Sequence, residues 1–268
     1  MKLELICEQV VTEAKKAGSF AMEQRANFNI NKVEVKGKHN FVSYVDRTCE
    51  AMLVDGLSKI VPQAGFIAEE GTGKPNKGGL NWVVDPLDGT TNYIHGISPF
   101  AVSIALMDDQ KLLLGVVYEA NLKECFWATA DSQAYLNGAP IKVSETGKVN
   151  DALVATGFPY YDYSRINPFF QTMEYFMRNS HGLRRLGSAA TDLVYVACGR
   201  FDAFYEYGLS PWDVAAGALI VERAGGRVCD FKRGNDFIFG GEIVATNSSL
   251  HGEFADILNG MMSKSQSE

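Results

Sequence analysis

The second half of the chain constrains the fold most, because short apolar runs alternate there with patterns typical of helices. Strands are predicted at residues 152–158, 183–186, 201–207 and 243–246, and helices at residues 167–179, 188–198, 211–224 and 248–262. Gly199 and Gly225 follow two of these helices, as glycine commonly does at a helix C-terminus. The alternation predicts a mainly parallel sheet covered by helices, which is the arrangement of an α/β domain.

The first half is expected to combine helices with antiparallel strands. Apolar residues recur at three- and four-residue steps at 3–25 and again at 41–61, so both segments are predicted to be amphipathic helices. Four short strand-like runs follow between residues 99 and 141, where the dipeptide Asn137-Gly138 is a strong hairpin signal. They predict an antiparallel meander packed on the helices. The lysine-rich stretch 29–40 is expected to be a mobile loop or an exposed hairpin, and the alternative is simply a run of solvated charges.

A polar stretch at residues 144–151 separates these two halves and is the best candidate for a domain boundary. We therefore expect an N-terminal α+β domain at residues 1–146 and a C-terminal α/β domain at residues 147–268, which completes the site.

Composition excludes several classes of function. The formal net charge of −7 argues against a nucleic-acid-binding surface, which would need a basic patch. The five cysteines are odd in number and form no C-x-x-C motif, so free thiols in a reducing compartment are expected. No run of 18 apolar residues exists, so no membrane span is expected, and a cytoplasmic location follows. An acidic protein can still bind a phosphate if metal cations invert the local field.

The stretch Asp85-Pro86-Leu87-Asp88-Gly89-Thr90-Thr91 follows the apolar run 81–84, which is predicted to be a buried strand. Because Pro86 fixes φ and lacks an N–H group, the chain is expected to leave the sheet there. Two carboxylates this close repel each other unless a cation lies between them, and Mg²⁺ prefers such oxygen ligands. The alternative is an ordinary turn with solvated Asp residues, since Pro, Asp and Gly all favour turns.

More acidic residues are expected to reach the same region. The predicted strand 65–68 ends in Glu69 and Glu70, which would join Asp85 and Asp88 if the two strands are neighbours. The alternative is that polar residues simply return where strands end.

The second half contributes two further acidic side chains. Ser210 and Pro211 mark a helix start, so Asp213 lies in the first turn, where the helix dipole favours an anion. Glu206 lies at the end of the preceding strand. Both are placed where open α/β sheets bind ligands, although a lone Asp in a first helical turn is often only structural.

Another interpretation of the acidic stretch is the aspartyl-phosphate chemistry of the haloacid dehalogenase superfamily. There the first residue of a strand-end Asp-x-Asp-Gly-Thr motif attacks phosphorus. Here Asp85 and Asp88 are three residues apart, with a proline between them. This spacing favours paired metal ligands over a nucleophile and an acid.

Three motifs, in this order, resemble the inositol monophosphatase family. They are Phe66-Ile67-Ala68-Glu69-Glu70, Asp85-Pro86-Leu87-Asp88-Gly89-Thr90-Thr91-Asn92-Tyr93 and Trp212-Asp213-Val214-Ala215-Ala216-Gly217. The resemblance covers about residues 4–260, at family-like spacing. It implies a layered αβαβα sugar-phosphatase fold and a Mg²⁺-dependent, Li⁺-sensitive phosphoric monoester hydrolase that is usually a homodimer.

The resemblance also implies ligands for two Mg²⁺ ions, with one carboxylate shared between them. The first ion would be held by Glu69, Asp85 and the main-chain carbonyl of Leu87. The second would be held by Asp85, Asp88 and Asp213.

Other roles follow from the same resemblance. Thr90 and Asp46 match a pair that orients or deprotonates the attacking water. Ser188 and Ala189 match a segment whose backbone contacts a sugar-like ring, and Glu206 matches a carboxylate that accepts hydrogen bonds from ring hydroxyls.

Two family positions lie at the edge of this site. Glu70 would lie beside the metals and contact them through water. Lys36 matches a lysine on a mobile loop, near which a third ion would bind. The spacing from Lys36 to Asp46 is one residue shorter than the family pattern.

Elementary chemistry supports a phosphate site at these residues. Two metal ions about 3.5–4 Å apart can clamp the attacking and leaving oxygens of an in-line displacement. The N–H groups of Gly89, Thr90 and Thr91 would cradle the phosphate if a helix starts there, and Gly89 permits close backbone approach.

The expected substrate is a small phosphate monoester, most consistently myo-inositol 1-phosphate, because the charge of Glu206 disfavours a second phosphate. The alternatives with the same fold are fructose 1,6-bisphosphate, a 3′-phosphoadenosine nucleotide and histidinol phosphate. A bisphosphate would need basic residues near the site, and the candidates are Arg165, Arg184 and Arg185. A further alternative is a non-catalytic regulatory or binding protein of the same fold.

Overall fold

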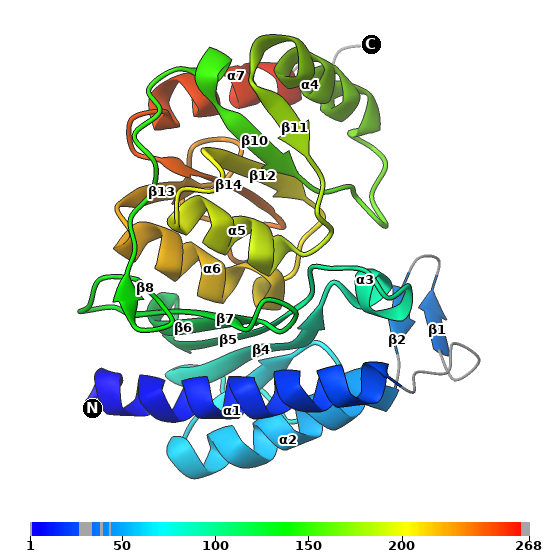
Figure 1. Ribbon diagram of the computed structural model, residues 1–268, viewed down its shortest axis with the longest axis vertical. Coiled ribbons are helices and arrows are strands. Elements are labelled where there is room, and N and C mark those ends of the chain that lie inside the picture. Colours follow the sequence, from blue (N-terminus) through cyan, green and yellow to red (C-terminus); the bar gives the residue numbers. More distant parts are fainter. Residues whose placement is uncertain (1, 27–33, 38–39, 43, 264–268) are drawn as a thin grey trace.

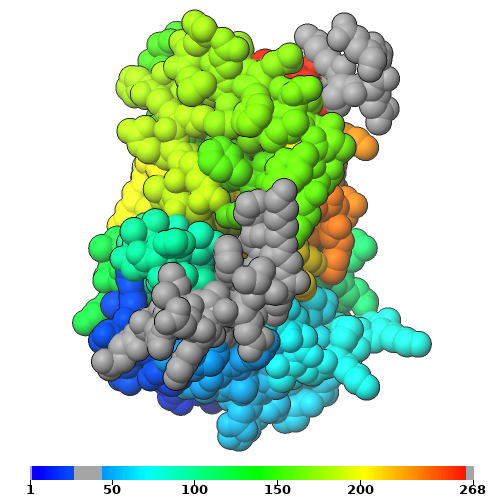
Figure 2. All heavy atoms as spheres, turned by 90° about the vertical axis from the view of Figure 1, so that its right-hand side faces the viewer, coloured from blue at the N-terminus to red at the C-terminus, as the bar shows by residue number. Residues whose placement is uncertain are grey.

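The computed structural model describes residues 2–26, 34–37, 40–42 and 44–263, with side chains for residues 2–26 and 44–263. Five layers stack in the order helix, sheet, helix, sheet, helix (Figure 1). The helices α1 (Leu3–Arg25) and α2 (Tyr44–Ile60) form one outer layer, and α4 (Ile166–Asn179) and α7 (His251–Met262) form the other. Figure 2 shows the same division from the side, with the N-terminal part below the second half. The expected layered αβαβα fold is confirmed.

The remaining described helices are α3 (Thr90–Ile94), α5 (Ala189–Ala197), α6 (Pro211–Arg223) and the 3₁₀ turn Val149–Asp151. The strands of the first half are β1 (Glu34–Gly37), β2 (Asn40–Val42), β3 (Gly65–Ala68), β4 (Leu80–Asp88), β5 (Ala101–Asp108), β6 (Lys111–Glu119), β7 (Glu124–Thr129), β8 (Tyr135–Leu136) and β9 (Ala139–Pro140). Those of the second half are β10 (Leu153–Thr156), β11 (Gly182–Arg184), β12 (Ala203–Tyr207), β13 (Gly226–Cys229) and β14 (Glu242–Asn247).

The first large sheet has the strand order β3-β4-β5-β6-β7-β8-β9. From β4 onward each strand pairs antiparallel with the next, which confirms the expected meander. β3 pairs parallel with β4, and Ala68 lies opposite Val84. Because the two strands run parallel in this register, Glu69, which follows Ala68, lies beside Asp85, which follows Val84.

Strand β4 does not end at Pro86, so the expectation that the chain leaves the sheet there is wrong. Asp85 lies opposite Ser103 and Asp88 lies opposite Ala101, so three steps on β4 match two steps on β5. The extra residue is a bulge, which accommodates the missing N–H of Pro86 within the sheet. The bulge also changes the direction in which the strand presents Asp88.

The second large sheet has the order β11-β10-β12-β14-β13 and is mixed rather than mainly parallel. β10 pairs parallel with both β11 and β12, as the strand–helix alternation predicted. β14 lies between β12 and β13 and is antiparallel to both. The prediction was wrong here because it missed β13, after which the chain returns along β14.

Among the described residues of this region, β1 pairs antiparallel with β2, which agrees with the expected hairpin. The side chain of Lys36 lies outside the described residues.

Helices α5 and α6 form the layer between the two sheets (Figure 1). Gly115 on β6 allows α6 to approach closely, since a Cβ there would lie 2.6 Å from the carbonyl oxygen of Ala216. The hydroxyl of Ser103 on β5 donates to the carbonyl of Trp212 at 3.0 Å. Together these contacts fix the N-terminus of α6 over the edge of the sheet that carries Asp85.

The polar stretch between the two halves is held by buried side chains of the second half. Ser144 donates to Asp202 at 2.5 Å, and Asn247 donates to Ser144 and to the carbonyl of Thr146. The second oxygen of Asp202 accepts the N–H of Leu153. These bonds fix the connection to β12 and β14, and the division into two domains stays a prediction.

Two expectations from composition can be compared with the structure. All five cysteines are free thiols. Within the described part of the chain, no helix combines the length and the apolar character needed to cross a membrane.

Candidate metal centre

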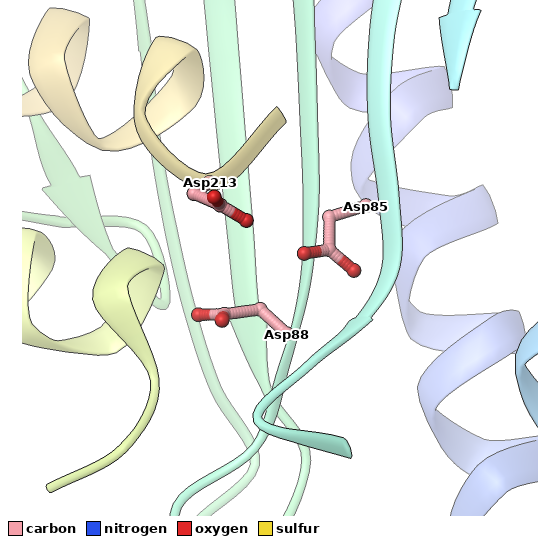
Figure 3. Close-up of side chains that lie close together, drawn as sticks. All are labelled: Asp85, Asp88 and Asp213. Atoms are coloured by element: carbon pink, nitrogen blue, oxygen red, sulfur yellow. The ribbon is translucent and has the colours of Figure 1, made fainter. Parts of the chain in front are cut away.

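Three aspartates from two distant segments meet between strand β4 of the first large sheet and the start of α6 (Figure 3). Asp85 and Asp88 come from β4, and Asp213 comes from the first turn of α6. One carboxylate oxygen from each lies within 4.8 Å of the others. The structure thus brings together residues that lie far apart in the sequence, at positions 85, 88 and 213.

Each of the three carboxylates is oriented by hydrogen bonds. Asp85 accepts the N–H of Leu87 at 2.8 Å across the bulge. Asp88 accepts the hydroxyl of Ser188 at 2.6 Å and the N–H of Ala190 at 2.8 Å. A carboxylate held by several donors keeps one orientation, so its other oxygen has a defined direction.

Asp213 is held by the helix that carries it. Its carboxylate accepts the N–H of Ser210 at 2.7 Å, as the third residue of a capping box that starts α6. The sequence predicted this helix start, and the cap gives Asp213 a structural role besides any role in the site.

Glu69 lies at the end of β3 and lines the same cavity as the three aspartates. Its backbone N–H donates to the carbonyl of Val84 at 3.2 Å, which places it beside Asp85, the next residue of β4. Glu70 is half-buried and is not part of the cavity lining formed by the described residues.

Burial and mutual repulsion make these acids hard to ionise together. Burial, with the charge of Asp213 next, raises the pKa of Glu69 to about 8. Burial, with the charge of Asp88 next, raises the pKa of Asp213 to about 7. The pKa of Asp88 rises to about 6 through burial, and burial raises that of Asp85 well above its usual range. A bound cation would favour the ionised forms of all four groups.

Thr90 at the start of α3 connects this cluster to α2. Its hydroxyl lies 3.0 Å from an oxygen of Asp46 and 3.0 Å from the carbonyl oxygen of Leu87. Asp46 is buried, with 1% of its surface exposed. The predicted pairing of Thr90 with Asp46 is therefore present. Gly89 precedes the helix with φ of 90°, a left-handed conformation that glycine adopts without strain.

The cavity above the cluster has a volume of about 290 Å³. Ser188, Ala189 and Glu206 line it, as the sequence analysis expected. The hydroxyl of Ser188 also donates to Asp88, a role the sequence analysis did not assign. The pKa of Glu206 is raised well above its usual range, chiefly by burial and then by the charge of Asp213.

Gly157 and two aromatic residues of the cavity wall, Tyr160 and Tyr161, were not predicted from the sequence. Gly157 lies against Glu206, since a Cβ there would meet the carboxylate within 2.0 Å. Thr156 at the end of β10 pairs with Tyr205 on β12, so the next residues of the two strands, Gly157 and Glu206, lie side by side. The sequence shows both strand ends but not that these strands are neighbours.

The three candidate arginines have different locations. Arg185 lines the cavity and donates to the hydroxyl of Tyr160 at 2.5 Å. Arg184 is exposed. Arg165 pairs with Glu242 at 2.6 Å and lies over the ring of Tyr207. Of the three, Arg185 alone lines this cavity.

The fold and the site together define a layered α/β protein with a cluster of carboxylates where its first sheet meets the start of α6. The sequence matches the model of the inositol monophosphatase family over residues 2–263. The chain belongs to this family.

Individual relatives cover nearly the whole chain. The Nus factor SuhB of Pseudomonas aeruginosa is 40% identical over 240 residues, which is 88% of this chain and 89% of that protein. The inositol-1-monophosphatase of Mesorhizobium japonicum is 39% identical over 242 residues, 90% of this chain and 91% of that protein.

Solved structures show the same fold. The extragenic suppressor protein suhB from Bartonella henselae superposes with a TM-score of 0.88 at 37% identity, covering 94% of this chain and 97% of that one. The inositol monophosphatase from Anabaena superposes with a TM-score of 0.86 at 34% identity, covering 96% of both chains.

Proposed function

We propose that the chain is a Mg²⁺-dependent phosphatase that hydrolyses a small polyol monophosphate, with myo-inositol 1-phosphate as the expected substrate. The observation that carries the proposal is the meeting of Asp85, Asp88 and Asp213 within 4.8 Å at a cavity of about 290 Å³. A small phosphate ester is of a size that such a cavity can hold.

The residues of the cluster fit a hard divalent cation. All the donors are carboxylate or carbonyl oxygens, which is the ligand set that Mg²⁺ prefers. The raised pKa values of Glu69, Asp88 and Asp213 are those of acids whose charges are uncompensated. Glu69, Asp85, Asp88, Asp213 and the carbonyl of Leu87 would hold the cations. Bound Mg²⁺ would supply charge neutralisation at the phosphate and an activated water.

The protein's own groups would bind and orient the substrate. Helix α3 begins at Thr90, so the backbone N–H groups of Thr90 and Thr91 have no carbonyl acceptor within the helix. They can therefore donate to phosphate oxygens. The hydroxyl of Thr90, held by Asp46, would orient the attacking water. Glu206 would accept from the hydroxyl groups of the polyol.

The arginine positions support a monophosphate over a bisphosphate. Of the candidate arginines only Arg185 lines the cavity, and its guanidinium already donates to Tyr160. A second phosphate would have to lie near the buried acid Glu206. We therefore expect fructose 1,6-bisphosphate and 3′-phosphoadenosine nucleotides to be poorer substrates.

A substrate panel tests the proposal. Phosphate release would be measured for myo-inositol 1-phosphate, fructose 1,6-bisphosphate, a 3′-phosphoadenosine nucleotide and histidinol phosphate, with titrations of Mg²⁺ and Li⁺. We expect the highest kcat/KM for the inositol ester, no release without Mg²⁺, and inhibition by Li⁺. A higher kcat/KM for a bisphosphate would contradict the substrate assignment.

The names of several relatives favour a second candidate function. The proteins from Pseudomonas aeruginosa and from Escherichia coli, at 40% and 39% identity, are called Nus factor SuhB. A binding role of that kind for this chain would predict a stable macromolecular partner. Affinity purification from cells would test it, and a recovered partner together with negligible phosphatase activity would favour this role.

A further inference from the structure

A buried glutamate on α2, Glu50, accepts hydrogen bonds from the backbone of the segment that carries Glu69. Its side chain is 0% exposed. One carboxylate oxygen accepts the N–H of Glu70 at 2.7 Å, and the other accepts the N–H of Thr72 at 2.8 Å. Both oxygens of one carboxylate are thus used to hold a single short stretch of backbone.

The backbone N–H groups of this stretch can all be accounted for. Those of Glu70 and Thr72 donate to Glu50. That of Glu69 donates to the carbonyl of Val84, and that of Gly71 donates to the carbonyl of Ala68. Glu50 therefore accepts two of these four backbone hydrogen bonds, and these two connect the turn to α2.

The position of Glu50 on its helix is also informative. It lies one helical turn after Asp46, so the two carboxylates share a face of α2. Asp46 accepts the hydroxyl of Thr90, which follows β4, and Glu50 accepts from the turn that follows β3. One face of α2 thus fixes both segments that lead out of the neighbouring strands at the cluster.

We infer that Glu50 is a positioning residue, whose carboxylate holds residues 69–72 so that Glu69 keeps its place as a ligand of the divalent cation. The inference rests on the proposed metal-dependent function. Groups that hold a metal ligand in place affect metal affinity about 10–100-fold when they are removed.

The variant Glu50→Gln is the sharpest test. A glutamine has nearly the same shape, but its amide nitrogen would face one of the two backbone N–H groups. Since both groups are donors, that hydrogen bond would be lost and replaced by repulsion. Two controls lie on the same helix. Asp55→Asn removes a carboxylate from an exposed pair with Lys59, and Leu53→Ala weakens the buried core without touching residues 69–72.

Binding of Mg²⁺ alone would be measured by calorimetry on the full chain. We expect Glu50→Gln to weaken binding about tenfold or more, and both controls to bind as the wild type does. In hydrogen exchange, the amides of Glu70 and Thr72 should exchange faster in Glu50→Gln, whereas those of β4 should be unchanged. The kcat at saturating Mg²⁺ should fall less than the affinity for Mg²⁺.

A double-mutant cycle separates positioning from general stability. If Glu50 acts through Glu69, then Glu50→Gln should cause little further loss in a Glu69→Gln background. Equal Mg²⁺ binding by wild type and Glu50→Gln would overturn the inference and leave the proposed function standing. An equal loss in Leu53→Ala would also overturn it. Failure of the wild type to bind Mg²⁺ would overturn both.

Discussion

The carboxylate of Glu206 lies directly against Gly157, and this contact shapes the part of the cavity that would bind the polyol. A Cβ at residue 157 would meet the carboxyl group within 2.0 Å, so any side chain there must displace Glu206. Because the obstacle is the far end of a side chain, the fold should tolerate the change.

Gly157→Ala is therefore expected to raise the KM for myo-inositol 1-phosphate about tenfold, which corresponds to the loss of one hydrogen bond between Glu206 and the polyol. Hydrolysis of p-nitrophenyl phosphate, which has no polyol hydroxyl groups, should change much less. Gly147→Ala is the matched control, since a Cβ there meets nothing within 4 Å. Equal losses on both substrates would show that the variant acts elsewhere than on polyol recognition.

The acidic cluster predicts a specific dependence of stability on pH. The pKa values of Glu69, Asp213 and Asp88 are raised to about 8, 7 and 6, above their values in an unfolded chain. The folded protein therefore holds protons that the unfolded chain releases, and stability falls as the pH rises from about 4 to about 8. Bound Mg²⁺ should oppose this fall, because it favours the ionised carboxylates.

Thermal unfolding with EDTA and with saturating Mg²⁺ would check this prediction. Without metal, the Tm should fall across this pH range, and the fall should be smaller in Asp213→Asn, which lacks one of the raised groups. The increase in Tm on adding Mg²⁺ should be larger at pH 8 than at pH 5. An increase that is independent of pH would contradict the assignment of these residues as cation ligands.

At the residue scale, sequence reasoning found side chains with a local pattern and missed those without one. Asp85 and Glu69 directly follow apolar runs, and Asp213 follows a helix-start signal, so all three were predicted. Glu50 has no such signal, because a glutamate in an amphipathic helix is expected to face solvent. Only the packing of α2 against the turn after β3 shows its contacts.

At the scale of elements, the approach of α6 to the first sheet sets the distance between Asp213 and Asp85. Gly115 makes this approach possible, because a Cβ there would lie 2.6 Å from the backbone oxygen of Ala216. The obstacle is main chain, which cannot rotate away as a side chain can.

Gly115→Ala is expected to destabilise the protein by about 1–3 kcal/mol, as overpacking of a close contact does. Gly260→Ala on α7 is the control, since a Cβ there meets nothing within 4 Å and alanine favours the helix. The free energy of unfolding would be measured by urea denaturation. A variant at residue 115 as stable as the control would show that the layers can separate without cost.

The elements themselves were predicted where hydrophobic periodicity was strong. The helices of the second half appear within a few residues of their expected bounds. Strand β13 was missed because Gly226–Cys229 is short, begins with glycine and contains an arginine. The continuation of β4 through Pro86 could not be predicted either, since a bulge is a property of two paired strands.

At the scale of the whole molecule, the expected homodimer stays a prediction. The outer helix α4 exposes Phe170 and Met177, seven residues apart on one face, at 55% and 58%. Neighbouring exposed apolar residues of this kind are typical of interaction surfaces. Light scattering after size-exclusion chromatography should give twice the mass of the 268-residue chain. A single-chain mass at micromolar concentration would contradict the dimer.

The central claim is that carboxylates from both halves of the chain make a Mg²⁺-dependent phosphatase. The most direct test is phosphate release from myo-inositol 1-phosphate by metal-free protein to which Mg²⁺ is added, for wild type, Asp85→Asn and the surface control Asp55→Asn. We predict that release requires Mg²⁺, that Asp55→Asn matches the wild type, and that Asp85→Asn loses more than about 100-fold, because a direct ligand should matter more than its supporting groups. Release by Asp85→Asn at the wild-type rate, or by wild type without Mg²⁺, would contradict the account.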